Sequence, residues 1–127
     1  MARATSKQAE QRRARLVTIC EALPEVDTTG SQHLNFRVRG KVIAYYLDDH
    51  HCDGMIVVSV KTTPALQAML VEDDPACFSL TPYMAHRGWV SVRIDGRSVD
   101  WDKVAALVRA SYRLVAPKRL ATQLPEA

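Results

Sequence analysis

Residues 89–94 read WVSVRI, in which aliphatic side chains alternate strictly with Trp89, Ser91 and Arg93. Successive side chains of a β-strand point to opposite faces, so this pattern predicts a strand with one face in a core. The other face carries an indole and a guanidinium, where a solvated strand more often carries Thr, Glu or Lys. This outer face is therefore the first place to look for a function.

The spacing of apolar residues, together with capping and turn residues, predicts the other elements of the chain. Helices are expected where apolar residues recur at helical spacing or a capping residue starts the run, at about residues 6–22, 63–71 and 100–115. Strands are expected at about residues 33–38, 41–47, 55–60, 77–80 and 89–94. Arg39 and Gly40 form a tight hairpin turn in this interpretation, and residues 27–31 form a loop by composition.

This order predicts an α+β fold: a helix, three strands, a helix, two strands and a helix. Short connections favour an antiparallel sheet, and alternation in every strand favours a two-layer domain with the helices on one face. At 127 residues the chain is expected to form one domain, residues 1–127, with flexible ends at 1–6 and 118–127.

The opposite face of the predicted sheet is expected to be open to solvent or to a partner. In the predicted hairpin register it collects polar, basic and aromatic side chains: His33, Asn35, Arg37, Tyr46, Ser59, Lys61, Trp89, Ser91 and Arg93. Cations neutralise phosphates and exposed rings stack on bases, so such a face suits nucleic acid. A solvated face and a protein or homodimer interface remain open alternatives for the same surface.

The charge distribution supports a polarised surface rather than a uniformly basic one. The formal net charge is only +3, with Lys and Arg crowded near both ends of the chain. Acidic residues gather at 48–49 and 72–74. No apolar run reaches the roughly 18 residues of a membrane span, and no association with a membrane is expected.

Catalysis, metal binding and cofactors have little support in the sequence. Residues 50–53 read HHCD, but adjacent side chains cannot all turn to one ion and no second ligand pair follows at zinc spacing. No nucleophile elbow, phosphate-binding loop or zinc-protease motif occurs, so we expect no enzyme, no catalytic residues and no cofactor. The three cysteines form no C-x-x-C pair, which favours a reducing cytoplasm.

Four segments together resemble the MmcQ/YjbR family of small bacterial proteins, and the resemblance extends over about residues 10–120. They are LPEV at 23–26, FRVRGK at 36–41, GWVSVR at 88–93 and SYRLVA at 111–116. The resemblance implies a fold similar to frataxin-like and type III secretion chaperone domains. It also implies DNA binding, with a double-wing arrangement as the contact surface.

The sequence and the resemblance together favour a non-enzymatic DNA-binding protein. Arg37, Lys61 and Arg93 are expected to neutralise phosphates, Trp89 and Tyr46 to stack or wedge, and His86 with Arg87 to act from a wing. The alternative is a protein-interaction or chaperone-like module, or a homodimer, that uses the same face. The sequence names no small-molecule ligand.

Overall fold

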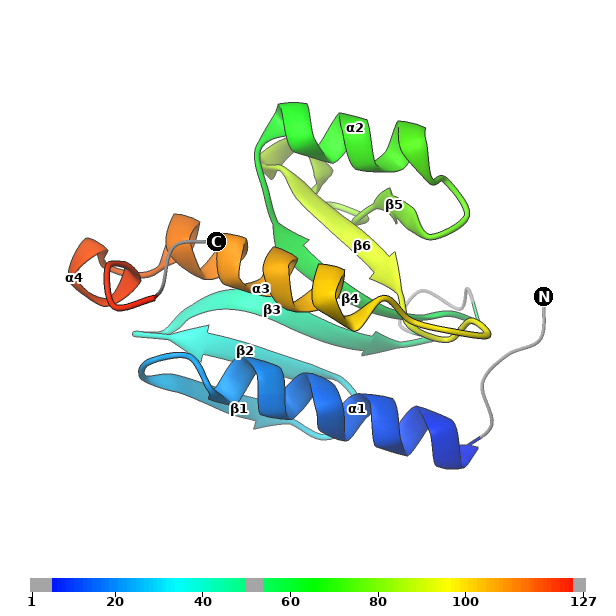
Figure 1. Ribbon diagram of the computed structural model, residues 1–127, viewed down its shortest axis with the longest axis horizontal. Helices are drawn as coiled ribbons and strands as arrows, with labels where there is room; N and C mark the ends of the chain where they lie inside the picture. The colour runs from blue at the N-terminus through cyan, green and yellow to red at the C-terminus, as the bar shows by residue number, and fades with distance from the viewer. Residues whose placement is uncertain (1–5, 50–53, 125–127) are drawn as a thin grey trace.

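The computed structural model of the protein describes residues 6–49 and 54–124 and contains helices and one sheet (Figure 1). The helices are α1 (Ser6–Glu21), α2 (Pro64–Asp73), the 3-10 turn η1 (Ala85–Arg87), α3 (Trp101–Val115) and α4 (Lys118–Ala121). The strands are β1 (Val26–Gly30), β2 (Leu34–Val38), β3 (Lys41–Asp48), β4 (Ile56–Lys61), β5 (Phe78–Leu80) and β6 (Trp89–Arg93). The predicted α+β class is confirmed.

The sheet has six strands in the order β1-β2-β3-β4-β6-β5, and every neighbouring pair is antiparallel. The prediction of a loop at residues 27–31 is wrong for 27–30, because these residues form β1. Asp27, Thr28 and Thr29 have the composition of a loop, yet an edge strand needs hydrogen bonds on one side only. Pairing with β2 supplies them, so the tertiary partner outweighs the local composition.

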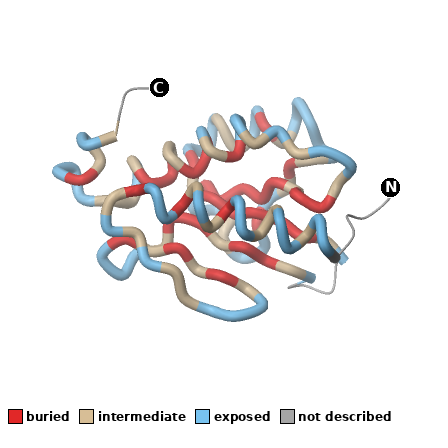
Figure 2. The backbone as a smooth tube through the Cα atoms, turned by 60° about the horizontal axis from the view of Figure 1, so that its bottom comes forward, coloured by how far each residue is buried: buried red, intermediate tan, exposed pale blue. Residues whose placement is uncertain are grey.

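One face of the sheet is covered by α1 and α3, which both lie in front of the strands in Figure 1. Buried residues run along the strands and recur at intervals along the helices (Figure 2). The core between these layers includes Leu16 and Cys20 of α1 and Val104 and Val108 of α3. The expected helix caps are confirmed, since Thr63 accepts from the Leu66 amide and Asp100 accepts from the Lys103 amide.

A β-bulge in β3 changes which side chains face the core. Arg37 pairs with Val42 but Phe36 pairs with Ala44, so Ile43 is an extra residue on β3. An extra residue moves every later side chain of that strand to the other face. The predicted place of Tyr46 on the open face is therefore wrong.

Tyr46 lies on the helix-covered face, and the bulge brings Tyr45 to the opposite face in its place. Tyr46 is only 2% exposed, and the guanidinium carbon of Arg13 on α1 lies 5.6 Å from its ring centroid. The new position of Tyr45 places its ring beside Trp89.

The end of the chain also differs from expectation. Residues 118–124, interpreted from sequence as part of a flexible end, form α4 and the turns after it. Leu120 is buried in the core, which anchors this segment. Within residues 6–49 and 54–124, no helix combines the length and the apolar character needed to cross a membrane.

Candidate nucleic-acid interface

Trp89 lies on the predicted face of β6, opposite the core residues Val90 and Val92, but it is not available to a base. Its side chain is 5% exposed, and its ring centroid lies 5.3 Å from that of Tyr45, with the planes tilted by 51°. The expectation of an exposed indole is therefore wrong. Trp89 forms part of a second, smaller packing layer on the face away from α1 and α3.

The centre of that face is closed by the segment that follows β5. Thr81 Oγ1 lies 3.0 Å from Ser91 Oγ, which in turn lies 2.7 Å from Ser59 Oγ, and all three residues are buried. The Gln67 amide donates to the carbonyls of Ala85 and Trp89, which ties α2 to the same segment. The predicted open face is thus open only on either side of this covered strip.

Arg93 serves a structural role rather than facing solvent freely. Its guanidinium donates to both carboxylate oxygens of Asp95, at 2.9 and 3.2 Å, and Asp95 is 1% exposed. Burial raises the pKa of Asp95, but the hydrogen bonds from Arg93 and from the Ile56 amide outweigh it, and the pKa is lowered overall. The pair stabilises the end of the sheet at which β4 begins.

Arg37 also has a carboxylate partner, but in a more exposed setting. Its Nε lies 3.1 Å from Asp27 Oδ1, and Asp27 stands directly opposite Arg37 in the β1–β2 register. Arg39 makes a similar pair with Glu25, at 2.7 Å. Exposed pairs of this kind contribute only about 0–1 kcal/mol, so an arriving phosphate can replace the carboxylate at little cost.

The strand register brings cations from separate segments to one end of the sheet, which we call the basic end. Val38 pairs with Lys41 at the β2–β3 hairpin, and Lys61 ends β4 beside Trp89, which follows η1. Arg119 of α4 is close enough to Glu25 to lower its pKa, after the larger effect of the Arg39 hydrogen bond. The basic end comprises Arg37, Arg39, Lys41, Lys61, Arg87 and Arg119.

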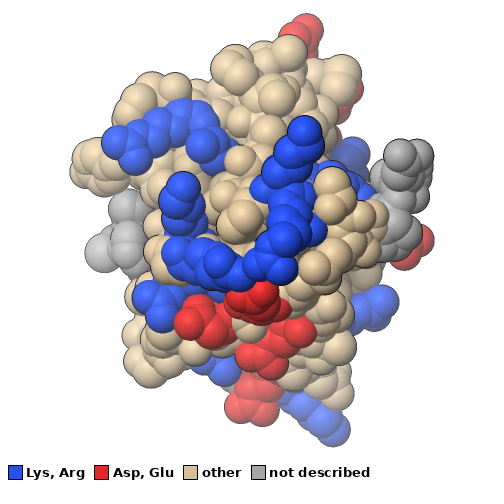
Figure 3. Space-filling model, turned by 90° about the vertical axis from the view of Figure 1, so that its left-hand side faces the viewer, with Lys and Arg blue, Asp and Glu red and all other residues tan. Residues whose placement is uncertain are grey.

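Figure 3 views the molecule from this end and shows Lys and Arg side chains gathered above a band of Asp and Glu. Two of the three residues predicted to neutralise phosphates, Arg37 and Lys61, belong to the basic end, as does Arg87 of the predicted wing. Arg93 does not, because it pairs with Val57 near the start of β4, whereas Lys61 ends that strand.

His86 and Arg87 are exposed on η1, just before Gly88. Gly88 has a φ of +87°, and a Cβ built on it would lie 2.0 Å from the Thr62 carbonyl oxygen. Its own carbonyl accepts from the Thr62 amide at 3.0 Å. The glycine is therefore required for a close approach that holds η1 against the end of β4, which keeps Arg87 beside Lys61.

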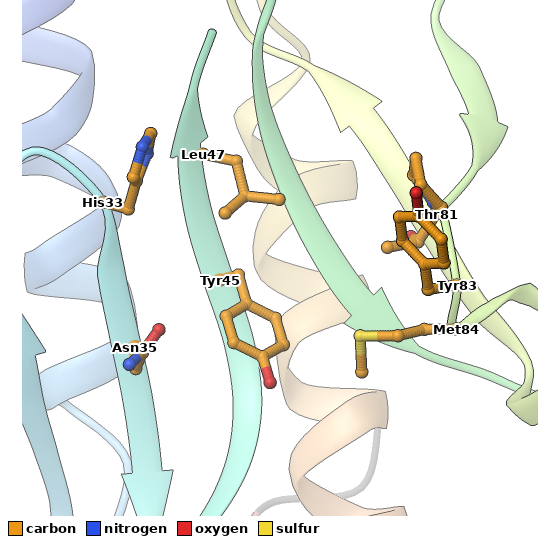
Figure 4. Close-up of a pocket in the computed structure, with 8 residues that line it drawn as sticks. His33, Asn35, Tyr45, Leu47, Thr81, Tyr83 and Met84 are labelled. Atoms are coloured by element: carbon orange, nitrogen blue, oxygen red, sulfur yellow. The ribbon is translucent and has the colours of Figure 1, made fainter. Parts of the chain in front are cut away.

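A groove of about 290 Å³ lies on the face away from α1 and α3, between β2–β3 and the segment after β5. Figure 4 shows Tyr45 and Leu47 on one side and Tyr83 and Met84 on the other, with the helices behind the strands. His33, Asn35, Thr81 and Pro82 complete the lining. The sequence did not point to this groove, because it needs the bulge that turns Tyr45 outward and a segment that folds back over the sheet.

His33 is held in one orientation at the end of the groove. Its Nδ1 accepts a hydrogen bond from the Asp48 amide at 3.1 Å. This hydrogen bond holds the imidazole beside the end of β3.

A family model named YjbR matches residues 21–114, which is more than half of the chain. The chain belongs to the YjbR family. The fold of this chain is similar to that in the crystal structure of Deinococcus radiodurans protein DR2400, a DUF419 family domain, with a TM-score of 0.71. The two share 24% sequence identity, over 91% of this chain and 90% of that one. No curated protein matches the chain.

The YjbR match contains all six strands, the groove and most of the basic end. Arg119 lies on α4 beyond the matched range, so α4 adds a cation to a surface otherwise formed by the YjbR-type region.

The thiols that the structure describes in this YjbR-family protein have raised pKa values. Burial raises the pKa of Cys20 to about 12, and burial also raises the pKa of Cys77. A thiol with a raised pKa carries little nucleophilic thiolate at neutral pH. Among the described residues, no group of three or more His, Cys, Asp or Glu could hold a metal ion. Residues 50–53, with the HHCD sequence, lie outside the described part of the chain.

Proposed function

We propose that this YjbR-family protein binds DNA through its basic end, without catalysing a reaction on it. The observation that carries the proposal is the meeting of cations from the β2–β3 hairpin, the end of β4, η1 and α4 at one end of the sheet. Clustered Lys and Arg release counterions from the phosphate backbone, which is the main source of affinity that does not depend on sequence.

The proposed contact differs from the sequence-based one in its aromatic part. Tyr46 and Trp89 are buried, so neither contributes a ring to the DNA. Two exposed turns take their place as the contacts: the hairpin turn with Lys41, and η1 with His86 and Arg87. Binding of this kind positions the protein on phosphates and carries little sequence information.

Fluorescence anisotropy with a labelled duplex at several salt concentrations tests the proposal. We expect binding whose logarithm falls linearly with the logarithm of salt concentration. Lys41→Glu and Arg87→Glu should each weaken binding and reduce the slope by about one.

Arg97→Glu is the matched control, because Arg97 is exposed near the opposite end of the sheet. Arg12 contacts its backbone carbonyl, which the substitution retains. Absence of duplex binding by the wild type, or equal weakening by Arg97→Glu, would contradict the proposal.

A second candidate function is self-association through the face that carries the groove. It is favoured by Tyr83, a large side chain that is 88% exposed beside an apolar groove. Light scattering across salt concentrations distinguishes the two functions, because apolar self-association persists at high salt whereas phosphate binding weakens.

A further inference from the structure

The groove is small and is lined mainly by apolar and aromatic side chains. Its volume of about 290 Å³ lies just below the range of roughly 300–1,000 Å³ that ligand pockets occupy. Tyr45 and Leu47 line it from β3, and Tyr83 and Met84 line it from the facing segment (Figure 4). These side chains offer ring and thioether surfaces to the faces of a planar ligand.

Polar groups line both walls of the groove. Asn35 of β2 carries an amide that both donates and accepts, and the imidazole of His33 lines the groove beside it. On the facing segment, the Thr81 hydroxyl lies within hydrogen-bond distance of the Ser91 hydroxyl, which also lies within hydrogen-bond distance of the Ser59 hydroxyl. A ligand with apolar faces and a hydrogen-bonding edge matches this arrangement, and a nucleobase has that chemistry.

The two ends of the groove lie near side chains of opposite charge. Arg37 lies two residues beyond Asn35 on the same face of β2, and Lys61 pairs with Trp89, whose ring contacts Tyr45. At the other end, His33 is hydrogen-bonded to the backbone of Asp48, which precedes Asp49. A ligand with a phosphate is therefore attracted toward the basic end and repelled from the His33 end.

Tyr83 is held in an unusual conformation at the rim. Its φ is 65°, in the left-handed region that bulky side chains rarely adopt, and its side chain is 88% exposed. Backbone strain of this kind is found preferentially at ligand-binding positions. Here it presents an aromatic ring to solvent directly beside the groove.

We propose that the groove holds one unpaired base of a single-stranded nucleic acid, whose phosphates contact the basic end. The proposal rests on the proposed function and narrows it, since bases in a duplex are paired and stacked and cannot enter the groove. In this arrangement the Tyr83 ring stacks on the base, and the Asn35 amide hydrogen-bonds to the edge of the base.

The test compares three probes by fluorescence anisotropy: oligothymidine, an abasic phosphodiester of the same length, and a duplex. We expect wild-type protein to bind oligothymidine more tightly than the abasic chain. Tyr83→Ala should weaken oligothymidine binding by about fivefold to 150-fold, the range that one base–aromatic stack covers. It should leave abasic and duplex binding unchanged, and Tyr83→Phe should restore the affinity.

Leu114→Ala is the control, because Leu114 is another exposed large apolar side chain and lies on α3, away from the groove. Equal weakening of the abasic chain by Tyr83→Ala would overturn the proposal, as would unchanged oligothymidine binding. Either result leaves the DNA-binding proposal standing if the duplex still binds with a salt dependence. Failure of all three probes to bind the wild type would overturn both proposals. Loss of a dimer in Tyr83→Ala, measured by sedimentation, would instead assign the groove to contact between copies of the chain.

Discussion

Ser111 of α3 donates a hydrogen bond from its hydroxyl to the carbonyl of Ile43, the extra residue of the β3 bulge, at 2.6 Å. The same oxygen accepts from the Lys61 amide at 3.1 Å. The hydroxyl thus bridges β3 and β4 at the point where the regular pairing ends at Ala44 and Val60. Because the bulge decides the faces of Tyr45 and Tyr46, this one hydroxyl supports the register on which the groove depends.

Ser111→Ala should lower the free energy of unfolding by about 1–3 kcal/mol, because it leaves a buried carbonyl and an amide without a partner. Urea unfolding followed by circular dichroism measures the change. Ser98→Ala, at an exposed position between β6 and α3, is the control and should have little effect. Equal stability of the two variants would show that the bridge is dispensable.

Gly88→Ala should be much more destabilising than Gly40→Ala. Both glycines have positive φ values, +87° and +79°, so both substitutions strain the backbone. Only at Gly88 does the new Cβ meet another atom, the Thr62 carbonyl oxygen at 2.0 Å; nothing lies within 4 Å at Gly40. Gly40→Ala should cost about 1–2 kcal/mol in thermal or urea unfolding. Comparable losses in the two variants would argue against the steric role assigned to Gly88.

The ion pair of Arg93 and Asp95 should make stability depend on acid pH. The folded-state pKa of Asp95 is lowered, so the stabilisation is present above the unfolded-state pKa of about 3.9 and is lost as the pH falls below it. Asp95→Asn should flatten this acid limb in urea unfolding between neutral and acid pH. Asp73→Asn, which alters an exposed carboxylate at the end of α2, should keep it. An unchanged acid limb in Asp95→Asn would contradict this assignment.

Cys20 should resist alkylation in the folded protein. Its side chain is buried between α1 and the sheet, and its pKa is raised to about 12, so the thiolate is scarce and inaccessible. Iodoacetamide labelling read by peptide mass spectrometry should modify Cys20 only when urea unfolds the chain. Rapid labelling in native buffer would show that α1 opens more readily than its packing indicates.

Local patterns predicted most of the elements because their signals are short-ranged. Thr63 and Asp100 cap helices, and the alternation in residues 89–94 forms β6, as expected. The edge strand β1 was not predicted, because its composition is that of a loop and pairing with β2 is what stabilises it. Arg37, Lys61 and Arg93 were expected to neutralise phosphates together; the antiparallel register brings Arg37 and Lys61 to one end of the sheet but places Arg93 near the other.

The sequence by itself determined the three longer helices α1, α2 and α3, the main strands and their apolar faces, since these depend on side-chain period and capping chemistry within a few residues. It also determined which Lys and Arg residues are present to form a basic surface. Only the tertiary structure decided which rings reach the surface: one bulged residue, Ile43, exchanged Tyr46 for Tyr45, and the segment around Tyr83 folded over Ser91. The reason is physical. Strand register and long-range coverage arise from pairing between distant segments, and a shift of one residue reverses every side chain that follows.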